Sequence, residues 1–238
     1  MPGTRHDVPV SRGPRLSTDQ AHLTLMLALT FSTGVVDAIG YLGLDRVFTG
    51  NMTGNVVVLG MALVGGNGLP ILGPLLALLG FLVGAATVGR GLRAETEPWS
   101  RATTVVLGIV GVVVLAVGVV LDVADGPARP LEVTCTTLLG IAMGMQAAAA
   151  RVVAVKDVTT VVVTSTLTGL AADSVLGAGT AQGASLRRAA AVVLIIAGAA
   201  LGAALLKVND GAGLAVAGAV ILVVAVAGAL HRRVAVAA

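Results

Sequence analysis

The sequence predicts an all-α polytopic membrane protein, with six transmembrane helices and two re-entrant broken segments arranged as a 3+3 inverted repeat. Of its 238 residues, 56% are hydrophobic and only 11% are charged. The apolar residues form six runs of about twenty, the length at which a helix crosses a hydrocarbon layer of about 30 Å. Two further apolar segments are interrupted by Gly, Thr and Asn, and almost all charges fall between the runs. A water-soluble fold would be left without a polar surface.

The composition also limits the partners and cofactors. The formal net charge is +3, but the basic residues are scattered at the ends of apolar runs rather than gathered in a patch, so we expect the lipid bilayer and no nucleic acid as a partner. The single cysteine, Cys135, lies inside an apolar run and can form neither an intramolecular disulfide nor a Cys-x-x-Cys site. We expect no metal and no cofactor.

The chain divides into four parts. Residues 1–20 are rich in Arg and Pro, which predicts a disordered cytoplasmic tail. Residues 21–122 are predicted to form a first membrane repeat, residues 131–230 a second, and residues 231–238 a cytoplasmic C-terminal tail. The first apolar run is too long for a signal peptide, so it is predicted to be an uncleaved span. The predicted spans are Leu23–Leu44, Ile71–Gly89, Thr103–Leu121, Val133–Ala150, Ala189–Leu206 and Gly211–Leu230.

The chain would have eight spans if both interrupted segments crossed the membrane and six if neither did. The positions of the basic residues decide between these two topologies. With six spans and the N-terminus inside, twelve Lys and Arg residues lie on the inner side and three, Arg46, Arg129 and Lys207, lie outside. Because Lys and Arg near span ends favour the cytoplasm, this bias predicts that both termini are cytoplasmic. It also predicts that the two interrupted segments, Val47–Gly66 and Val158–Ala172, each enter and leave the membrane on one side.

The two interrupted segments share the motif Thr-x-x-x-Thr-Gly, at Thr49/Thr53/Gly54 and at Thr164/Thr168/Gly169. We expect each segment to descend as extended chain and to return as a half-helix, so that two half-helix N-termini meet near the membrane centre. Their unpaired N–H groups and partial positive charge suit an anion or a carbonyl-bearing solute. The alternative is that the polar side chains only cap the half-helices and hold them together. The candidate substrate-binding residues are Thr49, Asn51, Thr53, Asn55, Gln146, Thr164, Ser165 and Thr168.

Asp37 is the one ionisable side chain well inside a predicted span. A charge at that depth costs at least about 2.5–3.5 kcal/mol on insertion scales, so Asp37 should face the bundle and have a partner or a function. One hypothesis is ion coupling, to H⁺ or another cation; the other is a neutral, buried carboxyl bonded to Asn51 or Asn55. Gln146 has a similar place in the fourth span and is predicted to line the same cavity or to form one interhelical hydrogen bond.

Both halves of the chain have the order span, broken segment, span, span. Three crossings in each half give the second half the opposite orientation, which is the plan of many secondary transporters.

Several strings resemble a known family. The first half contains Gly34-Val-Val-Asp37-Ala and Val47-Phe-Thr-Gly-Asn51-Met-Thr-Gly-Asn55, and the second half contains Gly144-Met-Gln146 and Val163-Thr-Ser-Thr-Leu-Thr-Gly169. These strings resemble the signature of the YoaK-like bacterial inner-membrane proteins, although this chain has Ala147 and Ser165 where the family often has Asn and Gly. The resemblance implies a multi-pass protein of the bacterial inner membrane. The family is one of unknown function, so the resemblance implies no substrate.

Together these features favour a secondary transporter or channel for a small polar or anionic solute, with a mid-membrane site between two half-helices. The alternative is a structural or assembly membrane protein without transport activity, but that role gives no reason for two matched broken segments. An enzyme is not predicted. Intramembrane enzymes need a Ser–His pair, two acidic residues at depth or His/Cys metal ligands, and His6, His22 and His231 all lie at or beyond the predicted membrane edge.

Three pairs of small residues are spaced for close helix contact. We expect most of them to pack helices within the chain, and one could form a homodimer face. The pairs are Gly80-xxx-Gly84, Gly140-xxx-Gly144 and Gly198-xxx-Gly202.

Overall fold

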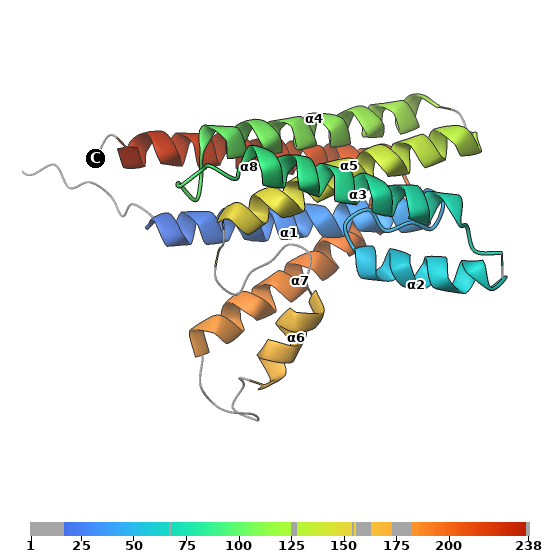
Figure 1. The fold of residues 1–238 in the computed structure, drawn as a ribbon, viewed down its shortest axis with the longest axis horizontal. Helices are drawn as coiled ribbons and strands as arrows, with labels where there is room; N and C mark the ends of the chain where they lie inside the picture. The colour runs from blue at the N-terminus through green and yellow to red at the C-terminus, as the bar shows by residue number, and fades with distance from the viewer. Residues whose placement is uncertain are drawn as a thin grey trace, which may run out of the picture.

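A computed structural model describes residues 17–66, 68–124, 128–153, 155, 163–172 and 182–236. Within these ranges the chain forms eight helices and no strand. Figure 1 shows a bundle in which α1 begins and α8 ends at the same end. The helices are α1 (Thr18–Leu42), α2 (Met52–Leu63), α3 (Leu72–Gly91), α4 (Arg101–Val123), α5 (Arg129–Val153), α6 (Val163–Ala172), α7 (Gln182–Leu205) and α8 (Ala212–Val236).

Six of the described helices, α1, α3, α4, α5, α7 and α8, are long and apolar enough to cross a membrane. The prediction of an all-helical polytopic membrane protein with six long apolar helices is therefore confirmed. The remaining two, α2 and α6, have only 12 and 10 residues. At 1.5 Å per residue they reach about 18 and 15 Å, roughly half the thickness of the hydrocarbon layer.

The first and last helices extend beyond the expected boundaries. Helix α1 begins at Thr18, inside the range predicted as a tail, because Ser17 and Gln20 form a capping box in which each side chain accepts a hydrogen bond from the other residue's N–H. Helix α8 continues to Val236 rather than ending before residue 231, and Arg233 in its last turn complements the helix dipole. Residues 1–16, the rest of the predicted N-terminal tail, lie outside the described residues.

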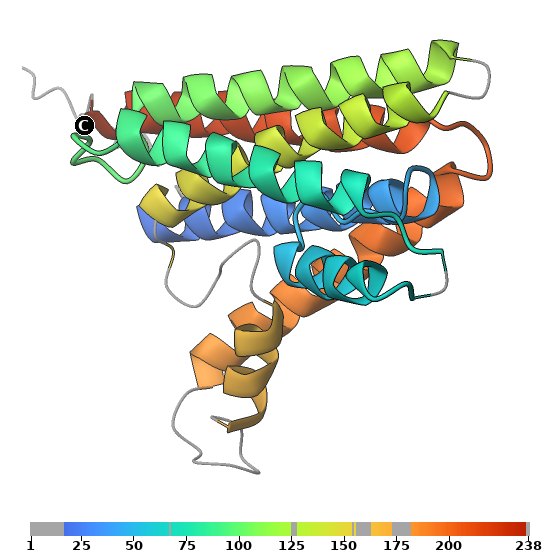
Figure 2. The same cartoon turned by 45° about the vertical axis from the view of Figure 1, so that its right-hand side comes forward.

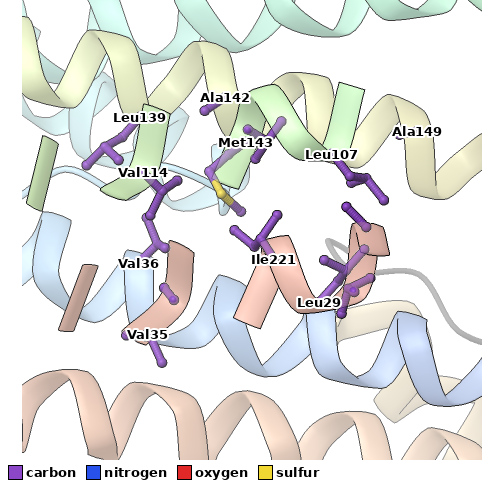
Figure 3. Close-up of a cluster of buried hydrophobic side chains, with 14 of the residues drawn as sticks. Leu29, Val35, Val36, Leu107, Val114, Leu139, Ala142, Met143, Ala149 and Ile221 are labelled. Carbon is purple, nitrogen blue, oxygen red and sulfur yellow. The ribbon is translucent and has the colours of Figure 1, made fainter. Parts of the chain in front are cut away.

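Four helices supply most of the apolar core. Lipid chains are as apolar as leucine, so close packing rather than the hydrophobic effect holds such helices together. The core side chains labelled in Figure 3 are at most 2% exposed and come from α1 (Leu29, Val35, Val36), α4 (Leu107, Val114), α5 (Leu139, Ala142, Met143, Ala149) and α8 (Ile221).

The long helices pack in pairs. Helix α3 packs along α5, α1 along α7 and α4 along α8, while α1 also contacts α8 and α4 also contacts α5. The short helices lie on this framework, α2 against α3 and α6 against α7. Figure 2 shows α6 and the first half of α7 leaning away from the other helices, so these two elements form one flank of the molecule.

Glycines bring the backbones of α3 and α5 into direct contact. A Cβ atom on Gly84 of α3 would overlap with the carbonyl oxygen of Ile141 in α5. One on Gly144 of α5 would overlap with the carbonyl oxygen of Phe81 in α3. Only glycine therefore permits this separation of the two helix axes.

The pair α1 and α7 repeats this arrangement. A Cβ atom on Gly34 of α1 would overlap with the carbonyl oxygen of Ile195 in α7, and one on Gly198 of α7 would overlap with the carbonyl oxygen of Phe31 in α1. All three predicted small-residue pairs lie at these two contacts within the chain, so a homodimer would have to use another surface.

Candidate functional site

A cavity of about 800 Å³ lies where the short helices approach the bundle. Its volume is that of a site for a small molecule. Helix α1, the segment before α2 and α2 itself supply most of the described wall, and α3, α6 and α7 each contribute one described residue. The lining residues are Thr33, Asp37, Tyr41, Phe48, Gly50, Asn51, Met52, Thr53, Gly54, Val57, Val58, Phe81, Thr164 and Ile195.

Asp37 connects the cavity to the chain that leads into α2. Its Oδ1 atom accepts hydrogen bonds from the backbone N–H of Thr49 at 2.9 Å, the backbone N–H of Gly50 at 2.7 Å and the Thr49 hydroxyl at 3.3 Å. Its partners are thus two backbone N–H groups and one hydroxyl, rather than the asparagine side chains that one hypothesis assigned to it. The backbone N–H of Asn51 also faces the carboxylate.

Asn55 holds the same segment from the other side. Its side chain is fully buried, accepts from the Phe48 N–H at 2.9 Å and donates to the Phe48 carbonyl oxygen. In hydrocarbon every backbone polar group needs a partner, so non-helical chain is stable there only when protein groups supply the hydrogen bonds. Asp37 and Asn55 supply them for the residues immediately before α2.

The N-terminus of α2 points at the cavity. Asn51 is the N-cap residue, and its side-chain oxygen accepts from the Gly54 N–H at 3.3 Å. Thr53 is exposed to the cavity. Gly50 allows the segment before α2 to lie close to α1, because a Cβ atom at this position would lie 2.9 Å from the Thr33 methyl group.

The second interrupted segment reaches the same cavity through Thr164, in the first turn of α6. Asn51, Thr53 and Thr164, three of the predicted site residues, therefore share one hollow. Thr168 does not line it, and its hydroxyl donates to the Thr164 carbonyl oxygen at 2.9 Å. Ser165 does not line it either. The predicted approach to α6, residues 156–162, lies outside the described residues.

Gln146 and Thr49 lie behind the cavity wall. Gln146 is 1% exposed, and its Nε2 donates to the Thr33 hydroxyl at 3.0 Å, which in turn donates to the Leu29 carbonyl oxygen at 2.9 Å. Thr49 is fully buried against Asp37. Of the two roles predicted for Gln146, the geometry is that of a single interhelical hydrogen bond.

Several lining residues were missed by sequence reasoning. Thr33 and Tyr41 stand four residues before and after Asp37, on one face of α1, so the i, i+4 spacing could have identified them. Tyr41 stacks on Phe48 with ring centroids 4.7 Å apart and an interplanar angle of 21°. Phe81 and Ile195 carry no signal in the sequence, because they are ordinary apolar residues of ordinary apolar spans.

No three His, Cys, Asp or Glu side chains in the described ranges lie close enough together to hold a metal ion. The polar chemistry of the cavity therefore comes from hydroxyl groups, amides, one carboxylate and backbone N–H groups.

Comparison with known proteins places this fold among uncharacterised membrane proteins. Residues 25–227 match the family described as protein of unknown function (DUF1275). Over 153 residues the chain is 35% identical to the UPF0700 transmembrane protein YoaK of Bacillus subtilis (strain 168). That alignment covers 63% of this chain and 66% of the relative, slightly less than two thirds of its length. No solved structure matches the chain.

Proposed function

The chain belongs to the DUF1275 family of membrane proteins of unknown function, and we propose that it is a secondary transporter or channel for a small polar solute. One observation carries this proposal: residues from both halves, including the N-terminal turns of α2 and α6, line one cavity of about 800 Å³. A structural or assembly role without transport is the alternative, and an enzymatic role is not proposed. A protein that only needed packing would have no use for such a hollow.

The helix pairings support the proposed 3+3 inverted repeat. If α1 to α4 exchange places with α5 to α8, the α1–α7 pair becomes the α5–α3 pair, and the contact of α1 with α8 becomes that of α5 with α4. The same exchange turns the α2–α3 contact into the α6–α7 contact and leaves α4–α8 unchanged. The weak α7–α8 contact has no such counterpart between α3 and α4, but the remaining pattern survives the exchange, as expected of two halves related by a pseudo-twofold axis.

The glycine contacts support the same correspondence between the helices of the two halves. Gly34 in α1 and Gly144 in α5 each meet a carbonyl oxygen of a partner helix, and so do Gly84 in α3 and Gly198 in α7. When the two halves are aligned so that Gly34 matches Gly144, Ala147 takes the position of Asp37. The proposed repeat therefore has a carboxylate in its first half and none at the equivalent position of its second.

We propose that α2 and α6 are re-entrant. Each is too short to cross a hydrocarbon layer of about 30 Å, and each begins at the shared cavity. A half-helix that starts at mid-depth and returns to its own side accounts for both features.

We also propose the bacterial inner membrane as the location, with both termini in the cytoplasm. In the described ranges, eight arginines lie in or next to the last turns of α3, α5 and α8 or the first turns of α4 and α7, the helix ends on the side where α1 begins. Arg46, Arg129 and Lys207 lie next to helix ends on the other side. Lys and Arg near span ends favour the cytoplasmic side. The eight are Arg90, Arg93, Arg101, Arg151, Arg187, Arg188, Arg232 and Arg233.

Cysteine accessibility tests this topology. The sequence alone suggests Asn67 and Asp125 as probes, but both lie outside the described residues, so Leu69 and Ala128 replace them. On a Cys135→Ser background, Leu69→Cys and Ala128→Cys are expected to react with an impermeant thiol reagent in intact cells. Glu97→Cys, exposed at the opposite end, should react only after permeabilisation. If Leu69→Cys behaved like Glu97→Cys, α2 would cross the membrane and the inverted repeat would be wrong.

Two threonine substitutions test the site itself. Thr53→Val and Thr164→Val keep the side-chain shape and remove a hydroxyl from the cavity, so each is expected to weaken solute binding about three- to tenfold, the value of one hydrogen bond. The measurement is binding and uptake by purified, reconstituted protein in a screen of amino acids, organic acids and small amines. Thr168→Val is the matched control, because that hydroxyl lies in α6 outside the cavity. Lower melting temperatures with unchanged binding would instead assign the threonines to packing.

A further inference from the structure

A second hollow adjoins the cavity at Asp37. It has a volume of about 440 Å³ and lies between α1 and α7. Its own walls are apolar, and it shares Asp37, Tyr41, Phe48 and Ile195 with the larger cavity. A carboxylate and two aromatic rings therefore stand where a polar cavity meets an apolar one.

The charge of this junction comes chiefly from Asp37 in the described part of the chain. Asp37 is the one charged side chain among the lining residues of the larger cavity in the described part of the chain, and no Lys, Arg or His joins it there. The N-termini of α2 and α6 contribute at most about half a positive charge each, and Asn51 already caps α2. An ionised Asp37 carries a full negative charge that at least offsets these partial charges, so the ionised site favours a cation over a free anion.

The carboxylate retains capacity for a ligand. The three hydrogen bonds from Thr49 and Gly50 all end on Oδ1, and the backbone N–H of Asn51 also faces the carboxylate, whereas no described side chain donates to Oδ2. Tyr41 is the other titratable group in either hollow, and the linings from α2, α3, α6 and α7 include none in the described ranges.

The aromatic rings add a second point of recognition. Tyr41 and Phe48 stack on each other and line both hollows. The faces of such rings attract cations, most strongly where water is excluded.

We propose that the cavity binds a monovalent organic cation, with its ammonium group at Asp37 and the Tyr41–Phe48 pair and its apolar body between α1 and α7. This inference rests on the proposed transport function and names the class of its solute. A proton and an ammonium group would neutralise the same carboxylate, so the two compete. Binding of one cation would release one proton, and this exchange would give Asp37 its role in ion coupling.

Calorimetric titration of the purified full-length protein in lipid nanodiscs tests this inference. The probes are benzyltrimethylammonium and tetraphenylphosphonium, with 3-phenylpropionate as an anion of similar size. Both cations are expected to bind and the anion is not. Asp37→Asn, which keeps an acceptor for the Thr49 and Gly50 N–H groups, is expected to weaken cation binding about tenfold or more. Titrations in buffers of different ionisation enthalpy should report the released proton in the wild type and none in Asp37→Asn.

A second set of variants makes the test independent of Asp37→Asn. Tyr41 is 37% exposed, so we expect its replacement to leave the protein folded. Tyr41→Leu is expected to weaken cation binding about threefold, Tyr41→Phe should retain it because the ring remains, and Thr168→Val should leave it unchanged. Equal affinity in the wild type, Tyr41→Leu and Asp37→Asn would overturn the inference. If Asp37→Asn could not be purified, equal affinity in the wild type, Tyr41→Leu and Tyr41→Phe would overturn it.

The outcomes also separate this inference from the proposed function. If neither cation bound while an organic acid or amino acid bound and lost affinity in Thr53→Val, the solute class would be wrong and the site would stand. If no solute of any class bound or was transported, the proposed function would fail together with the inference.

Discussion

Gly84→Ala is expected to lower the free energy of unfolding by about 2–3 kcal/mol, the effect of forcing extra volume into a close-packed contact. The added Cβ atom would overlap with the carbonyl oxygen of Ile141 and would also lie 3.1 Å from the backbone nitrogen of Met145. Backbone atoms cannot rotate away as a side chain can, so α3 and α5 would have to move apart. The measurement is the thermal or denaturant-induced unfolding of the purified protein in detergent.

Gly89→Ala is the matched control on the same helix. A Cβ atom at Gly89 meets nothing within 4 Å, so this variant should retain wild-type stability or gain up to about 1 kcal/mol from the higher helix propensity of alanine. Equal melting temperatures for the two variants would show that the α3–α5 contact tolerates a methyl group, contrary to the geometry.

Asn55→Leu is expected to destabilise the protein by about 2–4 kcal/mol and to abolish solute binding. The side chains are similar in size, but the change leaves the N–H and the carbonyl oxygen of Phe48 without their partner at a fully buried position. Each unsatisfied buried group costs about 1–3 kcal/mol. Phe48 and Gly50 would lose their positions in the cavity wall, so binding should fall even in the fraction that remains folded.

Val56→Leu is the control for this substitution. Val56 follows Asn55 in α2 and is 53% exposed, so a leucine there should change stability by less than about 0.5 kcal/mol. If Asn55→Leu melted at the wild-type temperature and bound solute normally, the hydrogen bonds of Asn55 would be dispensable and the segment before α2 would be held by Asp37 alone.

The positions of the helices followed closely from local sequence features. Runs of about twenty apolar residues are long enough to span the hydrocarbon, and six long helices formed over these runs. The glycine and asparagine that interrupt the first broken segment mark the start of its half-helix α2, because Gly50 permits the turn and Asn51 caps the helix. The boundaries at Thr18 and Val236 were misjudged, since charged residues near a helix end can belong to its caps and last turn as well as to a tail.

Some of the predicted polar residues line the cavity and others only form hydrogen bonds within the protein. Which residue does which depends on contacts between residues that are distant in the sequence. Asp37 and Asn55 were recognisable as costly groups in an apolar span, yet their partners, Thr49, Gly50 and Phe48, were not. A polar side chain in hydrocarbon must find a partner, but sequence spacing does not say which.

By itself, the sequence determined that this is a helical membrane protein, where its long helices run, and which few polar residues needed partners. These properties depend on segment length, composition and local capping. The tertiary structure alone decided which of the predicted residues line the cavity: Thr53 and Thr164 do, Ser165 and Thr168 do not, and Gln146 lies behind it. It alone also showed that Phe81 and Ile195 complete the wall. In a span that is apolar on all sides no face is marked by composition, so only the packing of one helix against another decides which side chains meet.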